Sequence, residues 1–222
     1  MRQAICFALL CSLVLSFTTG CSQAPRITYY SFESTAKPAA VTPPTAVAKK
    51  ERPSVSLESV TVPELVDRLQ LVQRINAARI DILEFHRWAE PLKSGIARRL
   101  ADNLSQALES DRVSIYPHNI GSDAEYRVFV DFHCFEFDGS AVTVDAQWGI
   151  RSRHDGRLRE GRVQSRLPTG TEGYEAAVTT FGRALAAVSD AISRSLQSEW
   201  AASSGENKSL PKTNLTPLNL PL

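Results

Sequence analysis

The chain has 222 residues, which corresponds to one domain with extensions or at most two small domains. Hydrophobic residues make up 43% and charged residues 22% of it, so a globular core can form and a wholly disordered chain is excluded. The formal net charge of +1 argues against a general nucleic-acid binder, because affinity for polyanions depends on many cations that neutralise phosphates. Four scattered cysteines are too few for a disulfide scaffold.

The first twenty residues have the pattern of a secretory signal peptide. Arg2 precedes an apolar run over residues 4–17, which is shorter than the roughly 20 residues that span a bilayer as a helix. Small residues then lead through Gly20 to Cys21, as in a bacterial lipobox, whose cysteine becomes the acylated first residue of the mature protein. We therefore expect residues 1–20 to be removed and Cys21 to carry covalent lipid, palmitate included, with no other cofactor.

Two neighbouring positions refine this prediction. A lipobox usually has leucine three positions before the cysteine, whereas Thr18 stands there, so an ordinary signal peptide followed by an unrelated cysteine is the alternative. Ser22 follows Cys21, where an aspartate would favour retention in the inner membrane of a Gram-negative cell. The sequence therefore predicts a lipid-anchored protein on the periplasmic face of the outer membrane.

Residues 21–53 join this lipid site to a domain. Ile27–Phe32 is rich in β-forming residues and predicts a first strand that returns to the main sheet. Residues 33–53 contain four prolines and no apolar periodicity, which predicts an extended linker. Residues 201–222 are rich in Ser, Asn, Lys and Pro and predict a disordered tail, which leaves 54–200 as the domain.

Within the domain, short apolar or alternating segments predict strands, and two stripes with helical spacing predict helices. Strands are expected over 55–62, 69–74, 79–86, 112–116, 126–137, 142–150 and 157–167. Asp138-Gly139 predicts a hairpin between two of them, alternate residues from Val142 to Ile150 predict one apolar face, and the charges of 157–167 suit an edge strand. Apolar residues from Leu92 to Leu108 at intervals of four predict a helix after Pro91, and a stripe from Tyr174 to Leu196 predicts a second within 172–200. This order predicts an α+β fold with two long amphipathic helices packed on one face of a mostly antiparallel sheet.

The strand over 126–137 has a predicted inner and outer face. Strict alternation puts one set on the core face: Tyr126, Val128, Val130, Phe132 and Cys134. The other set faces outward: Arg127, Phe129, Asp131, His133 and Phe135. We therefore expect Cys134 to be a buried free thiol.

The sequence contains no recognised catalytic or metal-binding motif. The four histidines do not have metal-site spacing, and there is neither a nucleophile elbow nor a phosphate-binding glycine loop. Adjacent His133 and Cys134 point to opposite faces of a strand and cannot easily share one metal. Asp131 and His133 are interpreted as solvated polar positions rather than a catalytic pair. We expect no catalytic residue and no metal.

The densest unusual stretch is His86–Leu92. A tryptophan beside Glu and Pro at a helix start is typical of a binding hot spot. The alternative is a strand-to-helix corner, with Trp88 in the core and Glu90 stabilising the helix N-terminus electrostatically. The sequence leaves both open.

Residues 62–74, 87–92 and 100–104 resemble the PqiC (YmbA) family, and the motifs Tyr126–Val128 and Ala146–Trp148 fit the same pattern. The resemblance covers nearly all of 27–200 and is most specific around Trp88–Pro91. It implies a non-enzymatic outer-membrane lipoprotein that docks the distal end of an MCE-domain tunnel protein (PqiB-like). Lipid transport between membranes and envelope integrity are the implied roles.

The resembling segments supply the candidates for shaping a docking surface: Arg68, Gln70, Arg74, Trp88 and Glu90. A periplasmic hydrolase without a recognisable motif and a structural lipoprotein that binds peptidoglycan are the alternatives. The transported lipid and the oligomeric state are not readable from the sequence, and a homo-oligomeric ring on a ring-forming partner is compatible with it.

Overall fold

The structure is a computed structural model that describes residues 25–32, 52–117 and 123–206. The predicted signal peptide, Cys21, most of the predicted linker and residues 207–222 lie outside these ranges. Within them, the chain forms eight strands and two helices. Their bounds are β1 Thr28–Tyr30, β2 Val55–Thr61, β3 Gln70–Arg74, β4 Ile80–Trp88, α2 Leu92–Ala107, β5 Val113–Ile115, β6 Tyr126–Phe137, β7 Ala141–Ser152, β8 Leu158–Pro168 and α3 Tyr174–Glu206.

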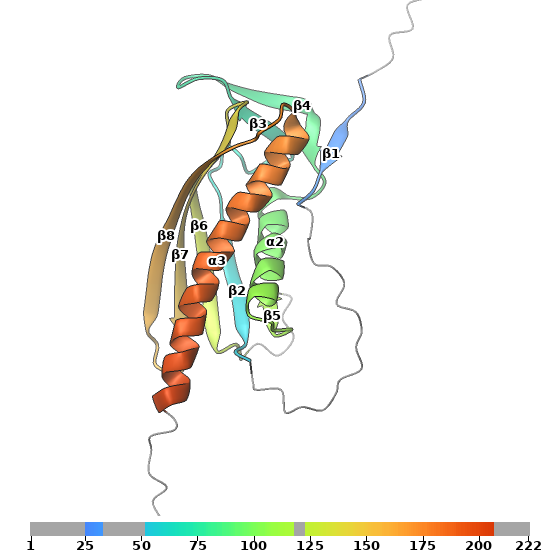
Figure 1. The fold of residues 1–222 in the computed structure, drawn as a ribbon. Coiled ribbons are helices and arrows are strands. Elements are labelled where there is room, and N and C mark those ends of the chain that lie inside the picture. Colours follow the sequence, from blue (N-terminus) through green and yellow to red (C-terminus); the bar gives the residue numbers. More distant parts are fainter. Residues whose placement is uncertain (1–24, 33–51, 118–122, 207–222) are drawn as a thin grey trace, which may run out of the picture.

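The predicted α+β class is confirmed, with both helices on one face of a single eight-stranded sheet (Figure 1). The sheet is mixed rather than purely antiparallel, and its longest strand pairs are antiparallel as predicted. The pairs β3–β4, β6–β7 and β7–β8 are antiparallel, whereas β2 runs parallel to β5 and β6, and β1 runs parallel to β4. Parallel neighbours arise because α2 and the long connections return the chain to the same end of the sheet before the next strand begins.

The central strand β6 organises the sheet. Along one side it pairs with β7 over its whole length, and along the other it meets β2 and then, at Gln73–Phe137, the end of β3. β8 pairs only with β7, which confirms the edge position expected from its polar composition. At the opposite edge, β1 confirms the strand predicted to return to the main sheet.

The turn between β6 and β7 forms where Asp138-Gly139 predicted a hairpin. Gly139 has a φ of +96°, a conformation that glycine adopts without a side-chain clash. The Asp138 carboxylate accepts hydrogen bonds from the backbone N–H groups of Ser140 and Ala141 at 3.0 and 2.9 Å. Partial burial acts to raise the pKa of Asp138, but these bonds and the one from Arg166 outweigh it and lower the pKa well below its usual range.

A β-bulge in β6 overturns the predicted position of Cys134. The alternation holds from Tyr126 to Phe132, but the register shifts between Phe132 and Cys134, which leaves His133 as the extra residue. Beyond this bulge Phe135 and Phe137 are buried, and Cys134 lies on the opposite face, half-buried, with its Sγ 3.8 Å from the carbonyl oxygen of Thr143. Burial, followed by the Glu136 and Asp145 carboxylates, raises the pKa of the Cys134 thiol to about 11.

The core lies between the inner face of the sheet and the two helices. The predicted stripes of both helices are fully or almost fully buried: Leu92, Ile96, Leu100 and Leu104 on α2, and Val178, Phe181, Leu185, Val188, Ile192 and Leu196 on α3. β7 supplies the facing layer with Val142, Val144, Ala146, Trp148 and Ile150, as its alternation predicted. α3 continues to Glu206, beyond its expected end at Trp200.

Candidate functional site

Trp88 ends β4 inside the core rather than on the surface. Its side chain is 5% exposed and contacts the rings of Phe32 at 5.0 Å and Phe181 at 6.3 Å between ring centroids. Its backbone N–H donates to the carbonyl of Leu69 at 2.6 Å, which binds the start of β3 to this corner. The packing alternative therefore holds for Trp88, and its indole is not available as the docking anchor that the sequence suggested.

Glu90 occupies the corner between β4 and α2. Its carboxylate forms an ion pair with Arg98 of α2, which lies 8 positions further along the chain. It also lies against Gly95, where an added Cβ would come within 3.2 Å of Oε1. A carboxylate over the first turns of α2 is favoured by the helix dipole, in agreement with the electrostatic position predicted for Glu90.

Arg68 and Gln70 reach the same corner from the start of β3. Gln70 lines a small apolar pocket with Leu71, Trp88, Phe135 and Phe181. Its volume of about 10 Å³ is too small to hold a lipid chain. The Nε of Arg68 is buried and has no hydrogen-bond partner among the residues that the structure describes.

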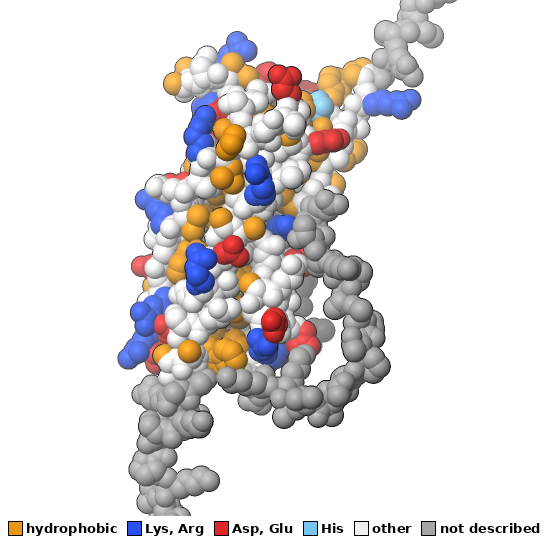
Figure 2. Space-filling model, viewed as in Figure 1, with side chains coloured by type: hydrophobic (Ala, Val, Ile, Leu, Met, Phe, Trp, Pro, Cys, Tyr) orange, Lys and Arg blue, Asp and Glu red, His pale blue; other side chains and the backbone are white. Residues whose placement is uncertain are grey.

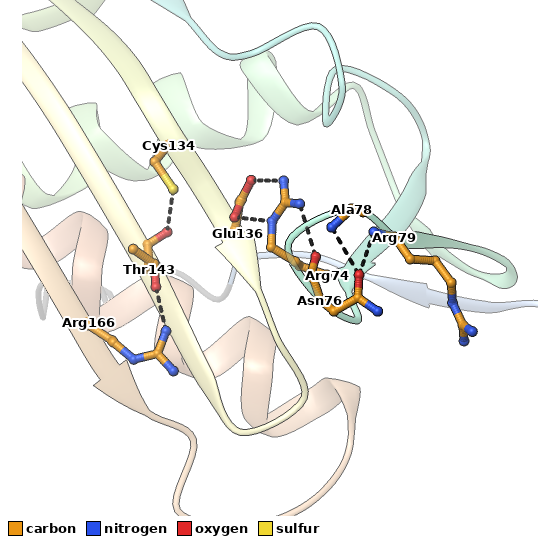
Figure 3. A network of polar contacts seen from close by, with 8 residues as sticks. All are labelled: Arg74, Asn76, Ala78, Arg79, Cys134, Glu136, Thr143 and Arg166. Carbon is orange, nitrogen blue, oxygen red and sulfur yellow. Dashed lines mark hydrogen bonds and ion pairs between the residues drawn. The ribbon is translucent and has the colours of Figure 1, made fainter.

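Arg74 lies at the far end of β3, apart from the other candidates. Its guanidinium makes a two-pronged ion pair with Glu136 of β6, in which Nε and Oε2 are 2.6 Å apart (Figure 3). This pair joins the end of β3 to the outer face of β6. The candidates thus divide into a corner surface, formed by Arg68, Gln70 and Glu90, a core residue, Trp88, and a sheet-stabilising ion pair, Arg74.

The sequence predicted that β1 returns to the main sheet, but not which side chains attach it there. The Tyr30 hydroxyl lies 2.8 Å from Nδ1 of His86, and the His86 ring lies 4.2 Å from that of Tyr174 on α3. Burial, followed by Glu175 and Tyr174, raises the pKa of Tyr30. With Phe32 in the core beside Trp88, these contacts hold the segment after the predicted lipid site against both β4 and α3. The three side chains come from distant parts of the chain, so no local pattern could have identified the cluster.

The described residues include no group of three His, Cys, Asp or Glu side chains placed to hold a metal ion. Asp131 and His133 are both exposed on β6, and the distance between Oδ2 of Asp131 and Nε2 of His133 is 3.7 Å. The Asp131 carboxylate also accepts a hydrogen bond from the Thr61 hydroxyl. Neither of the described helices is both long and apolar enough to cross a membrane.

Comparison with solved structures supports the fold. An uncharacterised protein of known crystal structure shares 20% sequence identity over 77% of this chain and 99% of its own, with a TM-score of 0.61. Protein XCC0632 from Xanthomonas campestris shares 16% identity over 80% of this chain and 99% of its own, with a TM-score of 0.59. No curated protein matches the sequence.

The family model described as "ABC-type transport auxiliary lipoprotein component" matches residues 30–193. The matched range begins in β1 and ends in α3, so it contains the β1 attachment, the corner surface and the whole sheet except the start of β1. The match agrees with the resemblance drawn from the residues around Trp88–Pro91. The chain belongs to the family of ABC-type transport auxiliary lipoprotein components.

Proposed function

We propose that this protein is a non-catalytic accessory subunit of an MCE/Pqi-type system that moves lipid between membranes and contributes to envelope integrity. It is anchored by lipid on Cys21 to the periplasmic face of the outer membrane and binds an MCE-domain tunnel protein (PqiB-like). The family is that of a transport auxiliary lipoprotein, which supports an accessory role. The partner system and the membrane rest on the sequence resemblance and on Ser22.

The observation that carries this proposal is the attachment of β1. Seven positions separate Cys21 from Thr28, the first residue of β1. β1 is held by its pairing with β4, by the Tyr30–His86 contact and by Phe32 in the core. A lipid on Cys21 is thereby coupled to a folded domain by a short segment, as a membrane-bound docking module requires and a freely diffusing enzyme does not.

The corner surface is the proposed docking site. Arg68 brings a partly exposed cationic side chain, and Glu90 brings a partly exposed carboxylate. Charged and polar groups of this kind fix the orientation of a partner more than they add raw affinity.

The test is capture of the MCE partner by the lipidated protein. Arg68→Glu should weaken capture by about tenfold or more, because it replaces a cation with an anion on the corner surface. Arg153→Glu is the matched control, since Arg153 is an exposed arginine on the β7–β8 turn and pairs with Asp123. Equal capture of the MCE partner by both variants would show that the docking site does not include the corner surface. Failure of the wild-type protein to bind any MCE protein would overturn the proposed function.

The anchor is tested separately. Cys21→Ala should leave precursor in the inner membrane or release soluble protein, because stable anchoring needs more than one acyl chain. Unchanged outer-membrane fractionation of this variant would refute lipidation. Genes for an MCE protein and a permease beside this one would support the transport system, whereas turnover of an envelope substrate or retention on peptidoglycan would favour the alternatives.

A further inference from the structure

Large exposed apolar side chains gather at one end of the molecule. The described residues include eight of them, and six belong to β1, β3 or β4 or lie directly beside one of these strands: Ile27 (40% exposed), Tyr29 (61%), Leu69 (48%), Ile75 (38%), Ile82 (37%) and Phe85 (45%). The other two, Tyr116 and Leu158, follow β5 and begin β8. This distribution marks the end where the β3–β4 hairpin lies beside β1 (Figure 1), and Figure 2 shows apolar side chains there together with basic and acidic ones. We exclude Leu69, which adjoins the corner surface, and call the other five the apolar end.

Strand pairing explains why these side chains are exposed. Successive partners across β3 and β4 are Gln70–Arg87 and Leu71–Leu83, so Glu84, Phe85 and His86 form an extra segment without partners in β3. β1 pairs with β4 only over His86–Trp88, which leaves the first part of β4 as a free sheet edge among the described residues. Because Thr28 pairs with His86, the preceding residues, Ile27 and Phe85, come to the same edge.

Hydrogen bonds order the turn between β3 and β4. The side-chain oxygen of Asn76 accepts hydrogen bonds from the backbone N–H groups of Ala78 and Arg79 at 2.9 and 2.8 Å (Figure 3). The backbone N–H of Ile75 donates to the carbonyl of Arg79 at 2.9 Å, which closes the turn. Ile75 is therefore exposed on an ordered turn, and Figure 3 shows the Arg79 side chain extending away from the Arg74–Glu136 pair.

Exposed arginines flank the apolar end. Arg26 precedes Ile27, and Arg79 lies between the turn and β4. Arginines beside exposed apolar residues suit the interface of a bilayer, where the guanidinium reaches headgroup phosphates and the apolar groups enter the acyl boundary. Asp81 and Glu84 are also exposed here, and Glu84 is 3.7 Å from Arg87, so charge contributes less than the apolar area.

We propose that the apolar end lies on the lipid surface that holds the Cys21 anchor, with Ile27, Tyr29, Ile75, Ile82 and Phe85 in contact with the bilayer interface. This inference rests on the proposed lipid anchoring. Six residues from Cys21 to Ile27 span at most about 20 Å when fully extended, which keeps this end, and no other, close to the acyl chains. This contact, in addition to the acyl chains, would fix the orientation of the domain on the membrane. Tyr116 after β5 and Leu158 at the start of β8 would then face away from the membrane.

The experiment uses the mature chain from residue 21 with Cys21→Ser, so that no acyl group contributes. Binding is measured by flotation with vesicles of phosphatidylethanolamine and phosphatidylglycerol. The double variant Ile82→Ser/Phe85→Ser should bind about tenfold more weakly, since interfacial binding follows the buried apolar area. The matched control, Tyr116→Ser/Leu158→Ser, removes two apolar residues elsewhere that are even more exposed (56% and 47%) and should bind like the parent. Arg79→Gln should weaken binding to these vesicles by about fivefold and leave binding to phosphatidylcholine vesicles unchanged.

A second measurement guards against a folding defect in the double variant. The lipidated protein carrying Phe85→Trp is placed in vesicles with brominated acyl chains, and its fluorescence should be quenched more than that of the wild-type protein. Equal quenching overturns the proposal, as does a Cys21→Ser chain that does not bind vesicles. A change of oligomeric state in Ile82→Ser/Phe85→Ser with unchanged vesicle binding also overturns it and assigns the surface to a second copy. Because the flotation assay lacks the acyl group, its outcome is independent of whether Cys21 is lipidated in cells.

Discussion

The β6–β7 ribbon and the β1–β3–β4 end of the same sheet differ in whether their apolar side chains are buried or exposed. Along β7, every second residue from Val142 to Ile150 is buried under the helices. Along β4, Ile82 and Phe85 are exposed, whereas Trp88 at the end of the strand is buried. The ribbon therefore has the pattern of a structural core, whereas the other end leaves large apolar side chains exposed, which is the surface that we propose contacts lipid.

This difference in burial follows from how completely partner strands and helices cover each region. β6 and β7 have partner strands along nearly their whole length and helices over one face, so alternation decides burial. β4 has β1 beside it for three residues only and an irregular register with β3, so the same alternation does not decide which side chain is covered.

The largest effect is expected from comparing Trp88 with Phe85 on the same strand. Trp88→Ala should lower the free energy of unfolding by about 3–5 kcal/mol, because it leaves a cavity between Phe32 and Phe181. Phe85→Ala should change it by about 0.5 kcal/mol or less, since the ring is 45% exposed. Urea unfolding followed by far-ultraviolet circular dichroism measures both. Similar losses in the two variants would remove the distinction between the regions.

Beside the ribbon, Gly161 of β8 is the next most sensitive position. It pairs with Trp148, and a Cβ on Gly161 would lie 2.2 Å from the indole Cζ2, so Gly161→Ala forces the ring to move. We expect a loss of about 1–3 kcal/mol in unfolding free energy. Gly182→Ala is the control, because its added Cβ meets no atom within 4 Å and alanine favours the helix by up to about 1 kcal/mol. If Gly161→Ala melts at the wild-type temperature, the predicted overlap is wrong.

A smaller and local effect is expected at β1. Tyr30→Phe removes the hydroxyl that lies 2.8 Å from His86, which should cost about 0.5–1.5 kcal/mol. Because β1 is a three-residue edge strand, the loss should appear as faster hydrogen exchange at the amides of β1, with little change in β7. Tyr29→Phe is the control, since Tyr29 is exposed and should not alter exchange. Equally faster exchange in β1 and β7 would show that β1 opens only with the whole domain.

The smallest effect on stability is expected at the bulge. Cys134→Ser should change the unfolding free energy by less than about 1 kcal/mol, because the thiol is half-buried outside the core. The raised thiol pKa of about 11 disfavours the thiolate, so alkylation of the native protein should be slow at pH 8 and rise with pH until about 11. Iodoacetamide labelling across this pH range measures the rate. A plateau near the ordinary thiol pKa, about 8.5, would contradict the burial at this position.

The sequence by itself determined the elements whose pattern is local. The stripe on α3, the inner face of β7, the hairpin at Asp138-Gly139 and the polar edge strand β8 all follow from the spacing of neighbouring residues. The family also followed from a contiguous motif around Trp88–Pro91.

Only the tertiary structure decided which surfaces these elements present. The bulge at His133 reversed the face of Cys134, and the burial of Trp88 was settled by Phe32 and Phe181, which lie 56 positions before it and 93 after it. The corner surface and the β1 attachment likewise join residues that are distant in the chain. Periodicity reports which side of an element is apolar, whereas strand register and the neighbours across the fold decide which of those side chains are covered.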